Sequence, residues 1–307
     1  DNVPIYKEIF DQSGISPVEI KRVKDLVKLP IINKSFLKLN FEKFIPKNLS
    51  SIPHIVMKTS GSTGKPLTIF RDKYEMIASD FRQKEMYELA GLTRGEWVAE
   101  FMGLVISTDF ETKVPFRTDY INKKIYFSSF HINDQNLKIF VNKLVEFDVK
   151  VLHAYPSSAY FLANFLLRNK KSFSLKAVIT SSETLLDYQK DVISKVFSCS
   201  VFDSYGQVEG VANAITDNKG DMFFLPTQSI VEIISDNNPN KGKIVGTHLH
   251  NFSLPLLRYD TGDIAIINRD KFISRYSVDK IYGRIEDVII TPDGRSIGIT
   301  AKFQNGE

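Results

Sequence analysis

Short apolar runs alternate with helical patterns between residues 136 and 203, and this alternation constrains the fold more than any other feature of the chain. Strand-like runs occur at Val149–Leu152, Lys176–Thr180 and Ser200–Asp203, whereas apolar residues recur at helical spacing around 159–167 and 188–197. Strands that alternate with helices lie parallel in a sheet whose faces the helices cover. The sequence therefore predicts an α/β protein built on a mostly parallel sheet.

The pattern changes after Gly220. Three short apolar runs, at 230–234, 243–247 and 264–267, are separated by turn sequences, and no helical spacing lies between them. Such a segment is typical of an antiparallel sheet or a small barrel. We therefore expect a small β-barrel-like part appended to the α/β body.

Composition excludes several classes of protein. The 307 residues are 43% hydrophobic, which is enough for a sizeable core, and 40 basic against 36 acidic residues give a net charge of only +4. This balance favours neither a nucleic-acid partner nor a membrane surface. A single cysteine, Cys199, rules out an internal disulfide and a multi-cysteine zinc site. No apolar run reaches the ~18 residues of a membrane-spanning helix, and a cytoplasmic location is the expectation.

The stretch Thr59-Ser60-Gly61-Ser62-Thr63-Gly64-Lys65-Pro66 combines hydroxyls, glycines and one lysine in a loop between predicted strands. Glycine allows close approach of the backbone, and hydroxyls, amides and lysine suit phosphate oxygens. The P-loop pattern fails, because Thr59 stands where the first glycine belongs and Pro66 follows the lysine. By itself the loop fits a phosphate site and an ordinary surface turn about equally.

Two polar clusters follow predicted strands of the parallel sheet, at the ends where open α/β sheets bind ligands. Thr180-Ser181-Ser182-Glu183 follows one strand, and Ser204-Tyr205-Gly206-Gln207-Val208-Glu209 follows the next. Each cluster also has an ordinary structural interpretation. Ser182 and Glu183 are typical of a cap on the following helix, and Tyr205-Gly206 is typical of a turn.

Two further clusters lie in the β-rich part. Leu257-Arg258-Tyr259-Asp260-Thr261-Gly262-Asp263 contains an arginine and two aspartates, which would form an internal salt bridge at a hairpin turn. Gly283-Arg284-Ile285-Glu286-Asp287 is followed by Asp293-Gly294-Arg295, and Asp-Gly is a favoured hairpin turn.

Taken in order, these motifs resemble the adenylate-forming ligase superfamily. The order is S-G-S-T-G-K-P, S-S-E, Y-G-x-x-E, R-Y-D-T-G-D and G-R-x-x-D. The resemblance is closest to phenylacetate-CoA ligase-like proteins of the CapK-like branch, named for capsular polysaccharide biosynthesis. The segments His153–Ser157, Ile179–Glu183 and Asp293–Arg295 are spelled as in that branch, and the resemblance covers nearly the whole chain.

The resemblance implies an ATP-dependent ligase. In such enzymes a carboxylate attacks the α-phosphate of ATP, which gives an acyl-adenylate and pyrophosphate, and the acyl group then passes to coenzyme A or to another acceptor. The transition state concentrates negative charge, so positioning and charge stabilisation dominate catalysis. Small-molecule acids and ATP are the expected partners, and the sequence permits a homodimer without deciding the oligomeric state.

The resemblance also implies roles for individual residues. The loop would hold the β- and γ-phosphates, Tyr205 would stack on adenine, Ser182 and Glu183 would line the base, and Gly206 would also belong to the ATP site. Glu209 would bind Mg²⁺, a cation that prefers oxygen ligands, and Asp263 would accept hydrogen bonds from the ribose hydroxyls. The expected phosphate-loop residues are Ser60, Gly61, Ser62, Thr63, Gly64 and Lys65. Arg284 would contact the ribose-phosphate side, Asp287 would mark a hinge, and Glu209, Lys65 and Arg284 would be catalytic.

The resemblance also predicts a domain organisation. We expect an α/β body at 1–220, a β-rich subdomain at 221–287 and a hinge with a remnant of a C-terminal domain at 288–307. On this interpretation the chain is the large N-terminal adenylation domain alone, without the C-terminal domain, so that ATP binding with weak adenylation is expected. Val208 also departs from the pattern, because Ser or Thr often stands there and valine cannot donate to phosphate.

One alternative function stays open. A non-catalytic descendant that binds nucleotide or acts as a scaffold in a polysaccharide pathway would keep the same motifs. A transferase that works without ATP is disfavoured, since the sequence has no Ser-His-Asp signature or paired catalytic carboxylates.

Overall fold

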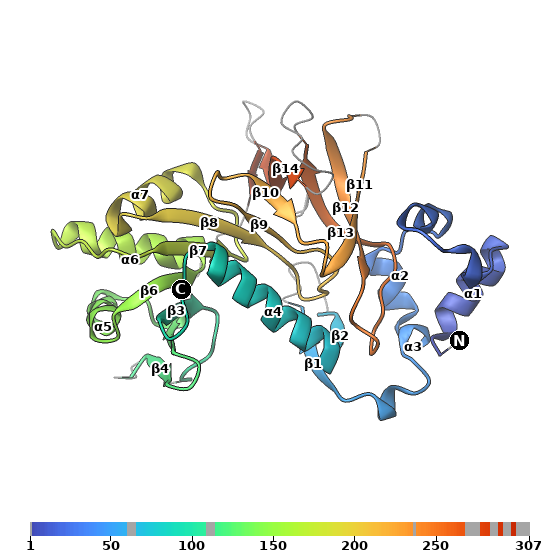
Figure 1. Ribbon diagram of the computed structural model, residues 1–307, viewed down its shortest axis with the longest axis horizontal. Coiled ribbons are helices and arrows are strands. Elements are labelled where there is room, and N and C mark those ends of the chain that lie inside the picture. Colours follow the sequence, from blue (N-terminus) through green and yellow to red (C-terminus); the bar gives the residue numbers. More distant parts are fainter. Residues whose placement is uncertain are drawn as a thin grey trace. The chain divides into compact units, whose positions relative to one another are not determined.

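The computed structural model describes residues 2–59, 66–108, 114–235, 238–267 and 277–282, together with the backbone of 288–290 and 296–298 (Figure 1). It consists of two compact units. One comprises 1–83, 205–214 and 222–307, and the other comprises 84–204 and 215–221. We call them the β-rich unit and the parallel-sheet unit.

The parallel-sheet unit is built on strands in the order β9-β8-β7-β6-β3-β5-β4. Strands β8, β7, β6, β3 and β5 run parallel, and β4 joins the edge antiparallel to β5. The bounds of the strands are β3 Trp97–Met102, β4 Phe116–Asp119, β5 Lys124–Ser128, β6 Val149–Ala154, β7 Ala177–Ser181, β8 Ser200–Tyr205 and β9 Ala214–Thr216. The expected α/β class with a mostly parallel sheet is confirmed.

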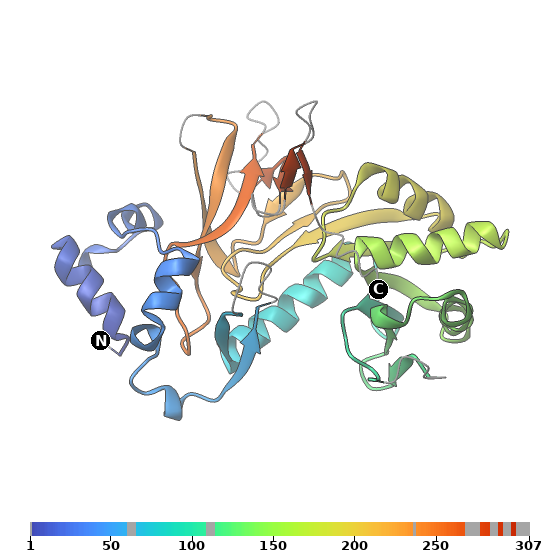
Figure 2. The ribbon, with the colours of Figure 1, turned by 180° about the vertical axis from the view of Figure 1, so that it is seen from behind.

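Three helices pack on one face of this sheet: α5 Asp134–Glu146, α6 Pro156–Arg168 and α7 Asp187–Phe197. Figures 1 and 2 show α6 beside α7. Helix α5 begins where the Asn133 side chain accepts a hydrogen bond from the Asn136 amide. Its residues Leu137, Phe140 and Leu144 return at helical spacing and are buried against the sheet.

An aromatic cluster lies at the centre of this core. Phe140 stacks on Phe127 with ring centroids 4.5 Å apart, and Phe101 meets both rings edge-on. All three side chains are fully buried. Because successive strand residues point to opposite faces, Phe101 faces the helices while Glu100 and Met102 face away from them.

The β-rich unit begins with helices α1 Pro4–Ser13, α2 Lys34–Leu39 and α3 Phe41–Phe44, with 3₁₀ turns at Pro17–Glu19, Val23–Lys28 and Leu49–Ser51. Strands β1 His54–Lys58 and β2 Thr68–Asp72 then pair antiparallel, so the glycine loop connects two strands as expected. Helix α4, Lys73–Leu89, follows directly and continues into the parallel-sheet unit.

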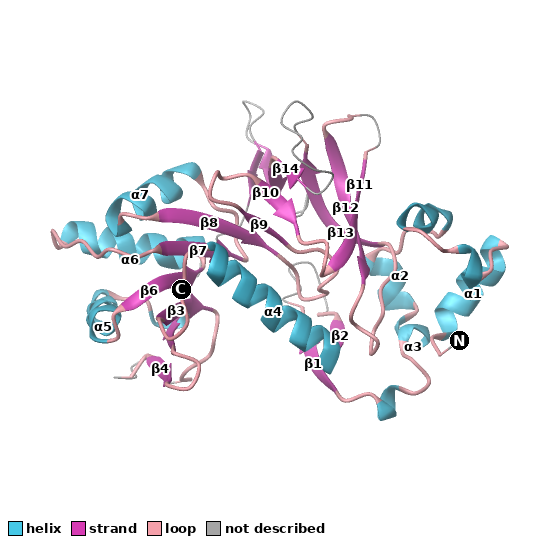
Figure 3. Cartoon of the chain, viewed as in Figure 1, coloured by secondary structure: helices cyan, strands magenta, loops and turns pink. Residues whose placement is uncertain are grey.

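An antiparallel sheet follows in the order β11-β12-β13-β15, as the sequence predicted. Figure 3 shows no helix between β11 and β13 or between β13 and β15 among the residues described there. The bounds are β11 Ser229–Ile234, β12 Lys241–His248, β13 Tyr259–Ile266 and β15 Lys280–Tyr282. Two further antiparallel pairs are β10 Met222–Phe224 with β14 Ser277–Val278, and β16 Val288–Ile290 with β17 Ser296–Gly298.

The hairpin interpretation of Arg258 to Asp263 is wrong. Residues from Tyr259 onward belong to strand β13, and Arg258 forms a bidentate pair with Glu232 of β11 at 3.0 Å instead of pairing with either aspartate. Its guanidinium also donates to the backbone oxygen of Leu29. Arg258 is buried, and a buried arginine is stable only when its donors are paired in this way.

Among the described residues, no helix is long and apolar enough to cross a membrane.

We predict that Phe140→Ala destabilises the protein by about 3–5 kcal/mol, because it removes a fully buried ring and leaves a cavity against Phe101 and Phe127. Urea unfolding followed by far-UV circular dichroism measures the loss. The matched control is Phe161→Ala on α6, where the phenylalanine is 51% exposed and the expected change is within about 0.5 kcal/mol. Equal losses in the two variants would contradict this description of the core.

Candidate functional site

The predicted phosphate loop lies largely outside the described residues: Ser60, Gly61, Ser62, Thr63, Gly64 and Lys65 are not described. Its two ends are. The Thr59 amide donates to the Leu67 carbonyl at 2.9 Å, and the Leu67 amide donates to Thr59 Oγ1 at 3.0 Å. Thr59 is buried, and the two bonds hold the residues on either side of the loop together at the end of the β1–β2 hairpin. Arg284 and Asp287 also lie outside the described residues.

Tyr205 and Asp263, predicted to contact adenine and ribose, come together in the β-rich unit. Tyr205 ends strand β8, and its hydroxyl donates to Asp263 Oδ2 at 2.7 Å. Its ring meets Phe224 edge-on at 6.3 Å. Burial, and then the Asp263 carboxylate, raise the pKa of Tyr205 well above its usual value. The phenol therefore keeps its proton and orients the carboxylate by donating to it.

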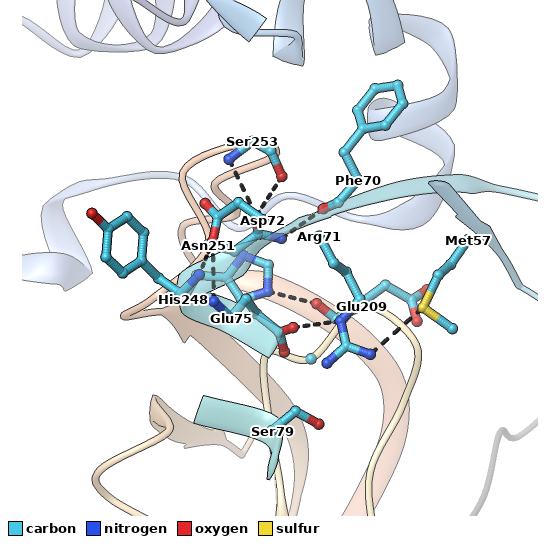
Figure 4. A network of polar contacts seen from close by, with 12 residues as sticks. Met57, Phe70, Arg71, Asp72, Glu75, Ser79, Glu209, His248, Asn251 and Ser253 are labelled. Atoms are coloured by element: carbon cyan, nitrogen blue, oxygen red, sulfur yellow. Dashed lines mark hydrogen bonds and ion pairs between the residues drawn. The ribbon is translucent and has the colours of Figure 1, made fainter. Parts of the chain in front are cut away.

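Glu209 is buried, with 4% of its surface exposed, and two strands hold it, one of them through His248 (Figure 4). The Tyr259 hydroxyl of β13 donates to Oε1 at 3.2 Å, and His248 Nε2 of β12 lies 2.5 Å from the Glu209 backbone oxygen. The carboxylate predicted to bind Mg²⁺ thus has its backbone and its side chain positioned by the antiparallel sheet.

The tautomer of His248 follows from its partners. The Leu256 amide donates to Nδ1 at 3.2 Å, so Nε2 carries the proton and donates to Glu209. Burial lowers the pKa of His248 to about 4, which keeps the ring neutral near pH 7.

The segment after Glu209 is held by helix α4. Arg82 donates to Asn213 Oδ1 at 2.6 Å and to Ser79 Oγ at 2.9 Å. Gly210 has a φ of +72°, and a Cβ there would lie 2.9 Å from Glu75 Oε1. Only glycine combines this backbone conformation with such close approach. At Gly206 a Cβ would similarly come within 2.9 Å of Asn213 Oδ1.

A buried ion pair and a helix cap lie near Glu209 and His248 (Figure 4). Arg71 of β2 pairs with Glu75 of α4. Asp72 Oδ1 accepts from the Tyr74 and Glu75 amides at 2.9 and 3.0 Å, which caps α4, and Oδ2 accepts from the Phe252 amide. The cap joins the end of the phosphate-loop hairpin to the connection between β12 and β13.

In the parallel-sheet unit, Ser182 and Glu183 do not cap the helix that follows them. Helix α7 begins at Asp187, whereas the Glu183 carboxylate accepts from the amide and the hydroxyl of Ser157 at 3.1 and 3.0 Å. Glu183 therefore caps helix α6, where a carboxylate is favourable near the positive end of the helix dipole. Ser182 is exposed and adopts a left-handed backbone conformation with a φ of 69°.

A chain of polar side chains crosses the sheet face opposite the helices. Lys124 Nζ and the Tyr87 hydroxyl donate to Glu100 Oε1 at 2.7 and 3.0 Å. Tyr87 lies 3.2 Å from His153 Nδ1, and His153 Nε2 lies 3.1 Å from Ser181 Oγ. Glu100 and His153 are register partners on β3 and β6, which places their side chains next to each other. We call these five residues the polar chain.

Several of these groups were missed from the sequence, although some left a signal. Asp72 and Glu75 have the Asp-x-x-Glu spacing of a helix start. His153 and Ser181 lie in segments that carry the CapK-like resemblance, but nothing in the sequence indicated that the two side chains interact. Arg82, His248 and Tyr259 had no local signal, because their partners lie far away in the chain. Among the described residues, no three His, Cys, Asp or Glu side chains are grouped to hold a metal ion.

Comparison with known proteins gives consistent relatives. The chain is 28% identical over 295 residues to Protein CapK of Staphylococcus aureus, which covers 94% of this chain and 65% of that protein. It is 24% identical to the phenylacetate-coenzyme A ligase of Aromatoleum evansii, with 94% and 68% covered. The chain is thus similar, along most of its length, to CapK and to phenylacetate-coenzyme A ligases. The expected phenylacetate-CoA ligase-like, CapK-like resemblance is thereby confirmed, and the chain spans about two thirds of the length of these relatives.

Solved structures support the same fold. A crystal structure of 2-hydroxyisobutyryl-CoA ligase in complex with R3-HIB-AMP superposes with a TM-score of 0.73 at 19% identity, covering 97% of this chain and 66% of that one. A long-chain-fatty-acid-CoA ligase from Archaeoglobus fulgidus gives 0.53 at 14% identity, with 78% and 56% covered. No family model matches the chain.

We predict that His153 makes stability depend on pH. Burial lowers its pKa to about 4 from the ordinary 6.5, and the opposing effect of Glu100 is smaller. As pH falls, the unfolded chain binds a proton before the folded one. The contribution is therefore fully present above about pH 6.5 and is lost towards pH 4, in total about 3 kcal/mol.

Urea midpoints of wild type and His153→Asn, measured from about pH 7 to about pH 4.5, test this dependence. The variant should lose less stability over that range than wild type does. The matched control is His250→Asn, at a histidine that is only partly buried. Parallel curves for wild type and His153→Asn would refute the prediction.

Proposed function

We propose that this chain binds ATP with Mg²⁺ and activates a carboxylic acid as an acyl-adenylate. One observation carries the proposal: Tyr205 and Asp263 are 58 positions apart, yet they meet through a 2.7 Å hydrogen bond in the β-rich unit that also holds Glu209. A nucleoside needs an aromatic face for its base and a carboxylate for its ribose hydroxyls, and this pair offers both. Homology to ligases of this type supports the assignment.

The residues present fit a magnesium ion that the nucleotide brings. Mg²⁺ is usually held by one or two carboxylates together with substrate phosphates rather than by a complete protein cage. Glu209 supplies one carboxylate, and its Oε1 is oriented by Tyr259. When bound, the metal would neutralise charge on the phosphate oxygens. Within this chain, His248 and Tyr259 hold Glu209 in place through hydrogen bonds to its backbone oxygen and its carboxylate.

In the proposed reaction, a carboxylate oxygen of the acid bonds to the α-phosphorus while the bond between that phosphorus and the leaving pyrophosphate oxygen breaks. By resemblance, Ser60 to Lys65 would bind the leaving phosphates, and Arg284 would contact the ribose-phosphate side. The Asp263 carboxylate, oriented by Tyr205, would fix the ribose. Proximity and charge stabilisation would then supply most of the rate enhancement.

We further propose that the acyl group passes to coenzyme A, as the names of the ligase relatives suggest, or to another acceptor. A role in polysaccharide biosynthesis rests on the name CapK alone. A cytoplasmic location and a homodimer stay predictions.

Asp263→Asn should weaken ATP binding about tenfold to a hundredfold, because hydrogen bonds to a charged acceptor contribute about 1.5–3 kcal/mol. Isothermal titration with ATP and Mg²⁺ measures the affinity. The matched control is Asp260→Asn on the same strand, where the carboxylate accepts from the Gly262 amide and lies 3.9 Å from Lys243. Its affinity should stay within about twofold of wild type. No measurable ATP affinity in wild type would overturn the proposal.

Pyrophosphate exchange on the native protein that carries this sequence separates the two functions left open. A panel of carboxylic acids should give exchange with at least one acid, and Glu209→Gln should reduce it by at least about a hundredfold. ATP binding without exchange for any acid would favour the non-catalytic alternative.

A further inference from the structure

The hydrogen bonds of the polar chain have one consistent direction. Lysine only donates and an ionised carboxylate only accepts, so the single proton of the Tyr87 hydroxyl goes to Glu100. The Tyr87 oxygen must then accept from His153, which puts the imidazole proton on Nδ1. Burial lowers the pKa of His153 to about 4, so the ring is neutral and its Nε2 is an acceptor.

The Ser181 hydroxyl therefore donates its proton to His153 Nε2, towards the interior of the protein. The His153 Nε2 acceptor lies 3.1 Å from Ser181 Oγ, whereas Met102 Sδ, a much weaker acceptor, lies 3.6 Å away. Tyr87 and His153 are buried, but Ser181 at the end of the chain is only half-buried. Its oxygen thus presents lone pairs, and no proton, to any ligand that reaches it.

The position of Ser181 favours a ligand contact. It is the last residue of β7, at the carboxyl end of a parallel strand, where ligands of open α/β sheets bind. Neighbouring strands bring Met102 and His153 to the same face and the same end. A serine with its proton engaged repels a carboxylate, since both are acceptors, but it binds a hydroxyl or an N–H group well.

We propose that Ser181 contacts the side chain of the carboxylic-acid substrate and selects acids that carry a hydrogen-bond donor, such as a hydroxyl or an amide N–H. The inference rests on the proposed function and concerns its substrate class. Tyr87 and His153 are positioning residues, because they act by fixing the direction of the serine proton. An acid without the donor would cover the outward lone pairs of Ser181 Oγ without pairing them, which lowers the reactivity of that acid.

Matched pairs of acids test the proposal in pyrophosphate exchange on the native protein. Suitable pairs are butyrate with 3-hydroxybutyrate, phenylacetate with 4-hydroxyphenylacetate, and benzoate with its three hydroxy isomers. For wild type we expect kcat/KM to favour the hydroxylated member of at least one pair by about tenfold. Ser181→Ala should bring that ratio close to one, mainly through KM, and Ser181→Thr should retain it.

Tyr87→Phe separates positioning from packing. It keeps the ring but removes the acceptor for His153 Nδ1–H, so the ratio should fall although Tyr87 does not contact the substrate. Nitrogen-15 NMR of labelled histidine should find His153 as the Nδ1–H tautomer in wild type and shifted towards Nε2–H in Tyr87→Phe. A purely structural role for Tyr87 would move neither the ratio nor the tautomer.

Exchange without preference for any hydroxylated acid, a preference that survives Ser181→Ala, or an Nε2–H tautomer in wild type would overturn this inference and leave the proposed function standing. Silence with every acid would overturn both. A donor preference that Ser181→Ala and Tyr87→Phe both reduce would support it.

Discussion

The hydrogen bond from His248 to the backbone oxygen of Glu209 is the interaction on which the geometry of the β-rich unit depends. A buried carbonyl needs a donor, and here the donor is a ring whose second nitrogen is already occupied by the Leu256 amide. The ring therefore cannot turn without losing both bonds. Because the Glu209 carboxylate is held separately by Tyr259, the antiparallel sheet fixes this residue at two points. The antiparallel sheet thus fixes the position of the Glu209 carboxylate.

The two faces of the parallel sheet carry different kinds of side chain. Alternation along β3 sends Phe101 into the aromatic core under α5 and sends Glu100 to the opposite face, where it joins Tyr87 and Lys124. The apolar face stabilises the unit by burial, whereas the polar face holds directed hydrogen bonds that only a rigid scaffold can keep aligned. A single strand therefore contributes to stability and to specificity through residues that are adjacent in sequence.

Local patterns predicted elements well, because helix spacing and β-α alternation act over a few residues; α5, α6, α7 and the strands between them appear where the sequence indicated. Only a family resemblance suggested roles for Tyr205 and Asp263 at one nucleotide, and no local pattern predicts the hydrogen bond between residues 58 positions apart. Arg258 shows the opposite failure. Its neighbours Asp260 and Asp263 suggested a local ion pair, but Glu232 of β11 pairs with the arginine instead. Tertiary partners override sequence proximity wherever a side chain is buried.

Glu183 carries a thermodynamic consequence. Its carboxylate already neutralises the start of α6 through both bonds to Ser157. A ligand that recruited this carboxylate would have to release the helix end, at a cost of about 1 kcal/mol, or roughly a fivefold loss in affinity. A base bound beside residues 182 and 183 would avoid that penalty by hydrogen bonding to the main chain. If the base were recognised through the backbone, α6 would stay capped by Glu183 in both the free and the ligand-bound protein. Binding of the base would then not change how often the first turn of α6 unfolds.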